Sequence, residues 1–222
     1  MNLDTVTVET GSDPSCAVIW LHGLGADGHD FEPMVPELKW QNAPSVRYVF
    51  PHAPVRSVTI NGGMQMRAWY DIRGMDLQDR VDEGGIRESA AQVTELIDQQ
   101  MSAGIPSERI VLAGFSQGGA VALMLGLTCP HPLAGIVALS TYLPMDAQLE
   151  TERLPANQNT PIFWGHGNMD PVVAYGLGEL SSARLRQWGY TLGWHEYPVG
   201  HGVHPQEVSD LKLWLQGCLS RP

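Results

Sequence analysis

Apolar positions along the chain fall into two patterns, short continuous runs and longer segments with helical spacing. The continuous runs predict strands at 6–9, 16–21, 46–50, 109–114, 133–140, 161–167 and 191–197. Helical spacing predicts helices near 30–39, 84–102, 117–128, 174–188 and 205–219. Strands that alternate with helices pair in parallel through right-handed crossovers. We therefore expect an α/β protein with one domain, 1–222, built on a mostly parallel, doubly wound central sheet with helices on both faces.

Two segments do not follow this alternation. The stretch 51–83 has no clear period, and an irregular segment of that length is usually functional or contains a misread element. The polar stretch from Met145 to Asn159 matches no motif. In doubly wound sheets, ligands bind beyond the carboxyl ends of the strands, so the loops that follow the strands are where chemistry is expected.

Composition and charge narrow the possible partners. Hydrophobic residues make up 43% of the chain and charged residues 17%, as in an ordinary globular enzyme. The net charge of −11 disfavours binding to nucleic acid or to anionic head groups. The three scattered cysteines lie in or beside apolar runs and indicate reduced, buried thiols. With no basic leader and no apolar run as long as a membrane span, a cytoplasmic location without a transmembrane segment is expected.

The sequence GFSQGG, residues 114–119, contains a G-x-S-x-G pattern between a predicted strand and a predicted helix. In this context the pattern indicates a nucleophile elbow, in which Ser116 stands exposed on a sharp turn and Gly114 and Gly118 let the backbone crowd together. The alternative is that Ser116 only caps the helix. The catalytic interpretation further requires a base, an acid and donors for an oxyanion.

The loop after the first buried strand, LHGLGADGHDF, supports two interpretations. Gly23, Gly25 and Gly28 spell G-x-G-x-x-G, but a dinucleotide site needs an acid about 20 residues later, and SVRYVFPHAPV contains none. We therefore expect no nicotinamide, flavin or other cofactor. In a hydrolase, this loop and the elbow would place the backbone amides of Leu24 and Gln117 at the oxyanion. Replacing these two side chains is accordingly expected to be uninformative.

The acid and the base are predicted from the chain order serine, acid, histidine. Asp170 follows the strand 161–167, although it could also cap the helix that begins near Pro171. His166 and Asp170 are spaced like a metal pair, but the adjoining glycines argue against a helix and no third ligand is evident, so no metal is expected. Among the late histidines, His201 lies between two glycines and is preferred as the base over His204, which precedes a proline at a helix-cap position.

The motifs LHGLGADG, PHAP, TINGG, AWYDI, GFSQGGA, HGNMDPVV and YPVGHGV occur in this order over nearly the whole chain. Together they resemble the small carboxylesterases related to acyl-protein thioesterases and lysophospholipases, which have the α/β-hydrolase fold. The resemblance implies a triad of Ser116, Asp170 and His201, with Leu24 and Gln117 as oxyanion donors.

The resemblance also assigns a role to the irregular segment, as the apolar wall of an acyl-binding groove. The residues concerned are Met64, Met66, Trp69, Tyr70 and Ile72. The alternative is a small hydrophobic cluster beneath a long loop. Arg67 places a charge beside this wall and leaves the preferred acyl length open.

The expected activity is hydrolysis of short- to medium-chain carboxylic esters, or of thioesters, through an acyl-enzyme. Acyl-protein thioesterase and lysophospholipase are the alternative physiological roles. A peptidase or amidase is less favoured, because the short chain leaves little room for a peptide-selecting cap. A noncatalytic binder would be expected to lack a triad member, and none is missing. Expected partners are a small-molecule ester or thioester, an acyl lipid or an acylated protein, and an exposed apolar rim would permit a homodimer.

Overall fold

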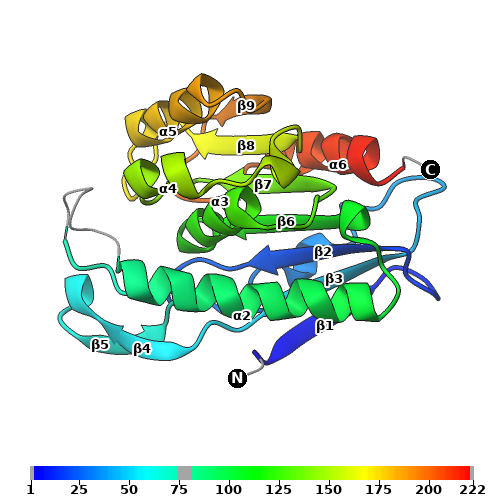
Figure 1. Cartoon of the computed structure of the whole chain (residues 1–222), viewed down its shortest axis with the longest axis horizontal. Coiled ribbons are helices and arrows are strands. Elements are labelled where there is room, and N and C mark those ends of the chain that lie inside the picture. Colours follow the sequence, from blue (N-terminus) through cyan, green and yellow to red (C-terminus); the bar gives the residue numbers. More distant parts are fainter. Residues whose placement is uncertain (1–2, 75–81, 221–222) are drawn as a thin grey trace.

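The computed structural model describes residues 3–74 and 82–220. Seven strands form one sheet in the order β1-β3-β2-β6-β7-β8-β9, with β9 at the upper edge and β1 at the lower edge of Figure 1. The strands are β1 Thr5–Glu9, β2 Cys16–Leu21, β3 Val46–Pro51, β6 Ile110–Phe115, β7 Gly135–Leu139, β8 Ile162–Gly167 and β9 Leu192–Tyr197. β1 pairs antiparallel with β3, and the other neighbours pair in parallel. All seven predicted strands are confirmed.

Helices cover both faces of the sheet, as predicted. The α-helices are α2 Glu83–Ser102, α3 Gln117–Thr128, α4 Asp146–Glu152, α5 Tyr175–Gln187 and α6 Pro205–Leu219. Helices α2 to α5 contribute to one hydrophobic core, whereas α6 and residues 31–38 contribute to the other. The strands feed both cores because their side chains alternate: Ile19 and Leu21 of β2 enter the first core, and Val18 and Trp20 enter the second.

The predicted helix at 30–39 is wrong. Only a 3₁₀ turn, η1 Glu32–Met34, forms there. Pro36 has no backbone N–H to donate to the Glu32 carbonyl, and the Val35 N–H donates to that carbonyl instead, in a 3₁₀ pattern, so an α-helix does not extend through this segment. Phe31 and Leu38 are nevertheless buried against β2 and its neighbours, which explains the helix-like spacing of apolar residues.

The segment 51–83 contains a two-stranded hairpin that the sequence pattern did not reveal. β4 Val55–Val58 and β5 Met64–Arg67 pair antiparallel around the 3₁₀ turn η2 Thr59–Asn61. These strands are four residues long and only Val58 is fully buried, so neither shows a strong apolar run. Residues 75–81 of the segment lie outside the described residues. Two further 3₁₀ turns, η3 Ser107–Arg109 and η4 Pro155–Asn157, lie elsewhere in the chain.

The polar stretch 145–159 contains the short helix α4, which buries only Leu149 and therefore has little amphipathic signal. The three cysteines are buried, as expected from their apolar surroundings, and no disulfide joins them within the described residues. Within residues 3–74 and 82–220, no helix has the length and apolarity that crossing a bilayer requires.

Candidate active site

Ser116 lies on the sharp turn between β6 and α3. Its backbone has φ 54° and ψ −118°, a left-handed conformation that residues with a side chain rarely adopt. Two hydrogen bonds hold it: the Ser116 N–H donates to the Leu139 carbonyl at 2.8 Å, and the Thr141 hydroxyl donates to the Ser116 carbonyl at 2.7 Å. The predicted elbow is thus fixed to the end of β7 as well as to β6.

Two glycines allow this turn to form. A Cβ at Gly114 would collide with the backbone of Gly118, and a Cβ at Gly118 would collide with the carbonyls of Leu21 and His22. The first turn of α3 therefore packs directly on the backbone of β6 and on the end of β2, which brings Ser116 next to the loop that follows β2.

Three side chains form a continuous hydrogen-bonded chain. The Ser116 hydroxyl lies 2.9 Å from Nε2 of His201, and Nδ1 of His201 lies 2.7 Å from Oδ2 of Asp170. The other carboxylate oxygen, Oδ1, accepts the amides of Val172 and Val173 at 2.8 and 2.9 Å. Because the carboxylate accepts Nδ1–H, Nε2 carries the lone pair that can accept the serine proton. The Asp170 carboxylate therefore contacts His201 through one oxygen and caps a turn through the other, whereas the helix expected near Pro171 begins only at Tyr175.

His204 is held in a structural role. Its Nδ1 accepts the Gln206 amide at 3.1 Å, and its own amide donates to Oε2 of Glu207 at 3.1 Å, so the pair forms a capping box at the start of α6. Glu207 is buried, and burial raises its pKa to about 7. Of the two late histidines, only His201 is hydrogen-bonded to Ser116.

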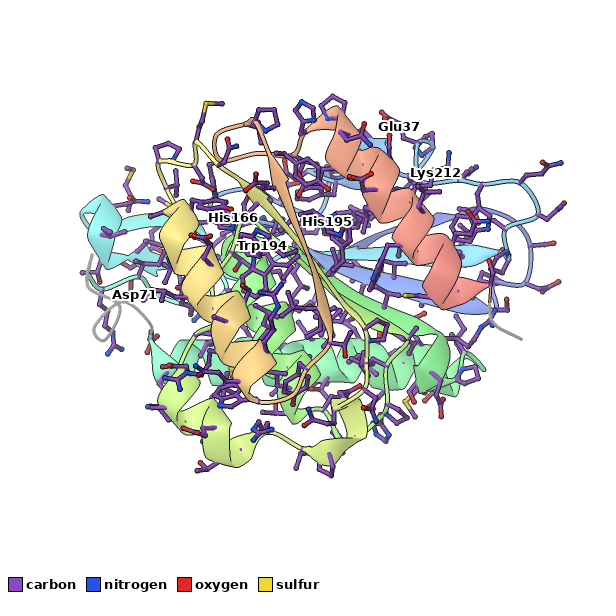
Figure 2. All side chains as sticks on the ribbon, turned by 90° about the horizontal axis from the view of Figure 1, so that it is seen from above. Glu37, Asp71, His166, Trp194, His195 and Lys212 are labelled. Atoms are coloured by element: carbon purple, nitrogen blue, oxygen red, sulfur yellow. The ribbon has the colours of Figure 1, made fainter. Side chains whose placement is uncertain are left out.

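His166 supports the loop that carries Asp170. It is buried on β8, and its Nε2 donates to the Val173 carbonyl at 2.9 Å, while Oδ2 of Asp170 lies 3.9 Å away. Burial lowers the pKa of His166, so the ring is neutral. Figure 2 shows His166 and Trp194 on the side of the sheet next to α5, and their rings stack. In the described part of the chain, no cluster of three histidine, cysteine or acidic side chains could hold a metal ion.

The two residues predicted to supply oxyanion donors border the same cavity as Ser116. Leu24 and Gln117 line the cavity beside Ser116, and no backbone acceptor within the described residues takes up either of their N–H groups. The loop of Leu24 is held by the adjoining amide, because Gly25 N–H donates to the Arg67 carbonyl at 2.9 Å. The expected oxyanion donors therefore lie on one rigid edge of the cavity.

His22 anchors the same loop. Its Nδ1 donates to the Gly23 carbonyl at 2.7 Å, and its Nε2 accepts the Ala53 amide at 3.0 Å. Burial lowers the pKa of His22 to about 4, so the ring is neutral and makes both bonds. The Arg67 guanidinium donates to the Ala53 carbonyl at 2.9 Å, which ties β5 to this network.

An apolar cavity of about 230 Å³ opens beside Ser116. Besides the residues named above, its lining includes Ala26, Asp30, Tyr70, Ile72, Phe115, Tyr142, Val172 and Val173. Of the predicted wall residues, Tyr70 and Ile72 are part of this lining, whereas Met64, Met66 and Trp69 are not. Met64 is 62% exposed on β5, and Trp69 is buried behind the wall with its indole N–H donating to the His22 carbonyl at 2.9 Å.

Three sets of residues at the cavity were not predicted from the sequence in this role. Tyr142 follows β7, so the rule that sites form beyond strand ends could have found it. Val172 and Val173 adjoin Asp170, which was a usable signal. The side chain of Gln117 gave no signal, yet it hydrogen-bonds to the backbone of Trp69 and Tyr70. Replacing this side chain would therefore test these two bonds, although it stays a poor test of the backbone amide.

The chain belongs to the phospholipase/carboxylesterase family, whose model matches residues 3–219. It is a serine hydrolase with the α/β-hydrolase fold, and the resemblance noted in its motifs is confirmed.

Among its relatives is acyl-protein thioesterase 1 of Cryptococcus neoformans, which is 41% identical, the match covering 92% of this chain and 93% of the relative. The Neurospora crassa protein of the same name is 40% identical, with 90% and 86% covered. Similar solved structures include Arabidopsis thaliana SOBER1, with a TM-score of 0.86, 30% identity and coverage of 92% and 99%. Zea mays acyl-protein thioesterase 2 has a TM-score of 0.86 at 28% identity, with 97% and 99% covered.

Proposed function

We propose that this protein hydrolyses carboxylic esters with short- to medium-length acyl chains through an acyl-enzyme on Ser116. The observation that carries the proposal is the unbroken hydrogen-bond chain from Ser116 through His201 to Asp170. An isolated serine hydroxyl is a weak nucleophile, and a neutral imidazole oriented by a carboxylate is the arrangement that activates it.

In the proposed reaction, His201 takes the Ser116 proton as Oγ attacks the substrate carbonyl carbon. The carbonyl π electrons move to oxygen, and the Leu24 and Gln117 amides donate to that oxyanion. His201 then gives its proton to the leaving oxygen or sulfur, which departs as an alcohol or thiol. Water repeats the sequence on the acyl-enzyme and releases the carboxylic acid. Asp170 holds the imidazole tautomer and stabilises the imidazolium throughout.

A second candidate is hydrolysis of thioesters, including those of acylated proteins. It is supported by the names of the curated relatives, which are 37–41% identical acyl-protein thioesterases. The apolar lining beside Ser116, with Ile72, Phe115 and Val172, suits an acyl chain attached through oxygen or sulfur. A lysophospholipid could present the same acyl group. A cytoplasmic location fits three buried cysteines that form no disulfide within the described residues, and a homodimer stays a prediction.

The test is a panel of oxygen esters and thioesters with graded acyl length, compared by kcat/KM. A serine-directed phosphonate should label wild-type protein at Ser116 and should not label Ser116→Ala. The Ser116→Ala variant should also lose turnover of every substrate in the panel. Substantial turnover by the alanine variant would exclude Ser116 as the nucleophile. A kcat/KM profile with consistently higher values for thioesters than for matched oxygen esters would favour the second candidate.

A further inference from the structure

We propose that the side chain of Gln117 is a positioning residue that sets acyl-chain selectivity, in addition to the backbone role expected for this residue. This inference rests on the proposed function. It concerns a side chain that the mechanism above does not use, and it links the nucleophile elbow to one wall of the cavity beside Ser116.

The Gln117 side chain bridges two consecutive residues of another segment. Its Oε1 accepts the Trp69 amide at 2.8 Å, and its Nε2 donates to the Tyr70 carbonyl at 2.6 Å. Gln117 is 2% exposed, and Trp69 and Tyr70 are fully buried. Both bonds are therefore made away from water, where the loss of a hydrogen bond costs more than it does at the surface.

The same segment is held from two other directions. The Ser89 hydroxyl of α2 donates to the Trp69 carbonyl, and the Trp69 indole donates to the His22 carbonyl at the end of β2. Of these three anchors, only Gln117 belongs to the nucleophile elbow. It therefore sets the spacing between Ser116 and the segment that carries the wall.

The spacing matters because Tyr70 and Ile72 line the cavity beside Ser116. Tyr70 is also hydrogen-bonded through its hydroxyl to Tyr142, which lines the cavity as well. Displacement of residues 69–70 would therefore move two lining side chains and disturb a third. A short acyl group that reacts at Ser116 without reaching this wall would be little affected, whereas a longer chain that packs against it would bind less well.

The first test is Gln117→Met, which has a similar shape but cannot form the two bonds and which keeps the backbone amide. Turnover of an acetyl and an octanoyl p-nitrophenyl ester is measured as kcat/KM. We expect the octanoyl value to fall by about tenfold more than the acetyl value, in line with what apolar pocket contacts contribute to discrimination.

The matched control is Gln100→Met. Gln100 is also a buried glutamine, near the end of α2, where its side chain accepts from Arg47 at 3.2 Å. This variant should unfold at a lower temperature while its ratio of octanoyl to acetyl turnover stays that of wild type. A similar change of ratio in both variants would mean that the effect is a general consequence of losing a buried amide.

The second test is Gln117→Glu, in which the hydrogen bond to the Tyr70 carbonyl depends on the protonation of the new carboxyl group and therefore on pH. A carboxylate can accept the Trp69 amide but repels the Tyr70 carbonyl, whereas a protonated carboxyl group can donate to it. The octanoyl-to-acetyl ratio of this variant should therefore be low at high pH and return toward wild type as pH falls. The effect of pH on the triad cancels in this ratio, because turnover of both substrates depends on the triad in the same way.

Three results would overturn the proposal: equal losses on both esters, no loss in Gln117→Met, or a ratio in Gln117→Glu that does not change with pH. If Gln117→Met does not fold, the octanoyl-to-acetyl ratio of Gln117→Glu at two pH values still tests the proposal, since that comparison needs only one protein. Phosphonate labelling of Ser116 in wild type separates failure of this inference from failure of the proposed function. Labelling with an unchanged ratio defeats only the Gln117 role, whereas absence of labelling and turnover defeats the hydrolase.

Discussion

Two sets of groups adjoin Ser116 at the cavity: on the triad side they are side chains, whereas on the oxyanion side they are the backbone amides predicted to bind the oxyanion. The triad side consists of Asp170 and His201, from the loops after β8 and β9, joined by direct side-chain hydrogen bonds. The oxyanion side consists of the loop after β2 and the start of α3. Its loop is held through side-chain contacts to the main chain at Ala53 and through the Arg67 carbonyl.

Two histidines show what this difference means. His201 contacts a carboxylate on one nitrogen and a hydroxyl on the other, so the ring can move a proton between side chains. His22 contacts main-chain groups on both nitrogens and is nearly inaccessible to solvent. A substitution on the triad side should therefore remove the chemistry at once, whereas one on the oxyanion side should act through the position of the backbone.

The largest expected effect is that of His201→Ala. Loss of the proposed base should lower kcat by about 10⁴-fold or more, as loss of a triad histidine does in a serine protease. His204→Ala is the matched control, because His204 only caps α6. It should keep activity within a few-fold and reduce stability by about 1 kcal/mol. The measurement is turnover of a butyryl ester together with urea unfolding, and the opposite order of activity losses would assign the base to His204.

The next largest effect is expected for Asp170→Asn, which should lower kcat by a factor on the order of 10³ to 10⁴, since an amide would favour the wrong tautomer of His201. The comparison variant is Asp146→Asn, which removes an exposed carboxylate that pairs with Arg184. Steady-state kinetics on one ester suffices. A loss below tenfold for Asp170→Asn would indicate that another acid orients the imidazole.

Two buried groups outside the triad, His22 and Glu207, should make stability respond to pH in opposite directions. Burial lowers the pKa of His22 to about 4, below its ordinary value of 6.5, so the stability linked to this group is lost as pH falls from 6.5 toward 4. Burial raises the pKa of Glu207 to about 7, above its ordinary value of 4.5, so its contribution is full below pH 4.5 and is lost as pH rises toward 7. Each change amounts to about 3 kcal/mol.

Because the two changes oppose each other, the contributions of His22 and Glu207 to stability should largely cancel between pH 4.5 and 6.5. Urea unfolding across this range should show stability that rises with pH in Glu207→Gln, which keeps an acceptor for the His204 amide. In His22→Asn, stability should instead fall as pH rises. If the free energy of unfolding changed with pH in the same way in wild type and both variants, neither His22 nor Glu207 would be responsible for the pH dependence of stability.

The smallest expected effect concerns Arg67, the charge that stands beside the wall. Arg67→Met keeps the carbonyl that accepts from Gly25 but loses the bond to the Ala53 carbonyl, so the loop of Leu24 should be less well held. We expect kcat to fall by about tenfold with KM nearly unchanged, because the affected amide would act in the transition state. Arg56→Met, on the same hairpin, is the control. A change confined to KM would instead place Arg67 in substrate binding.

The sheet and the meeting of Ser116, Asp170 and His201 could be predicted because each depends on local patterns. Buried parallel strands are continuously apolar, and Ser116 and Asp170 follow such strands, β6 and β8. His201 follows β9, a partly buried edge strand, and is placed by the chain order serine, acid, histidine. The hairpin β4–β5 lacks that signal, since its strands are short and mostly accessible. Around Pro36, apolar residues have helix-like spacing because a turn is buried there, so the spacing alone predicts a helix that does not form.

The lining of the cavity could not be predicted residue by residue. Trp69 and Tyr70 are adjacent and equally buried, yet only Tyr70 lines the cavity, and their spacing in sequence does not say which one does. The two bonds of Gln117 span 48 and 47 positions, so they depend on the packing of α3 against a distant segment. Such contacts are properties of the folded chain, and no local pattern encodes them.

At Ser116, stability and activity favour different residues. The left-handed backbone conformation lowers stability for any residue with a side chain, whereas turnover needs the serine hydroxyl. Such a conformation costs about 1 to 3 kcal/mol for a residue with a side chain, whereas glycine adopts it freely. A library selected only for survival of heat would be driven to exchange this serine for glycine and would lose the nucleophile. Directed evolution of this scaffold toward robustness therefore requires that hydrolysis be screened in every round.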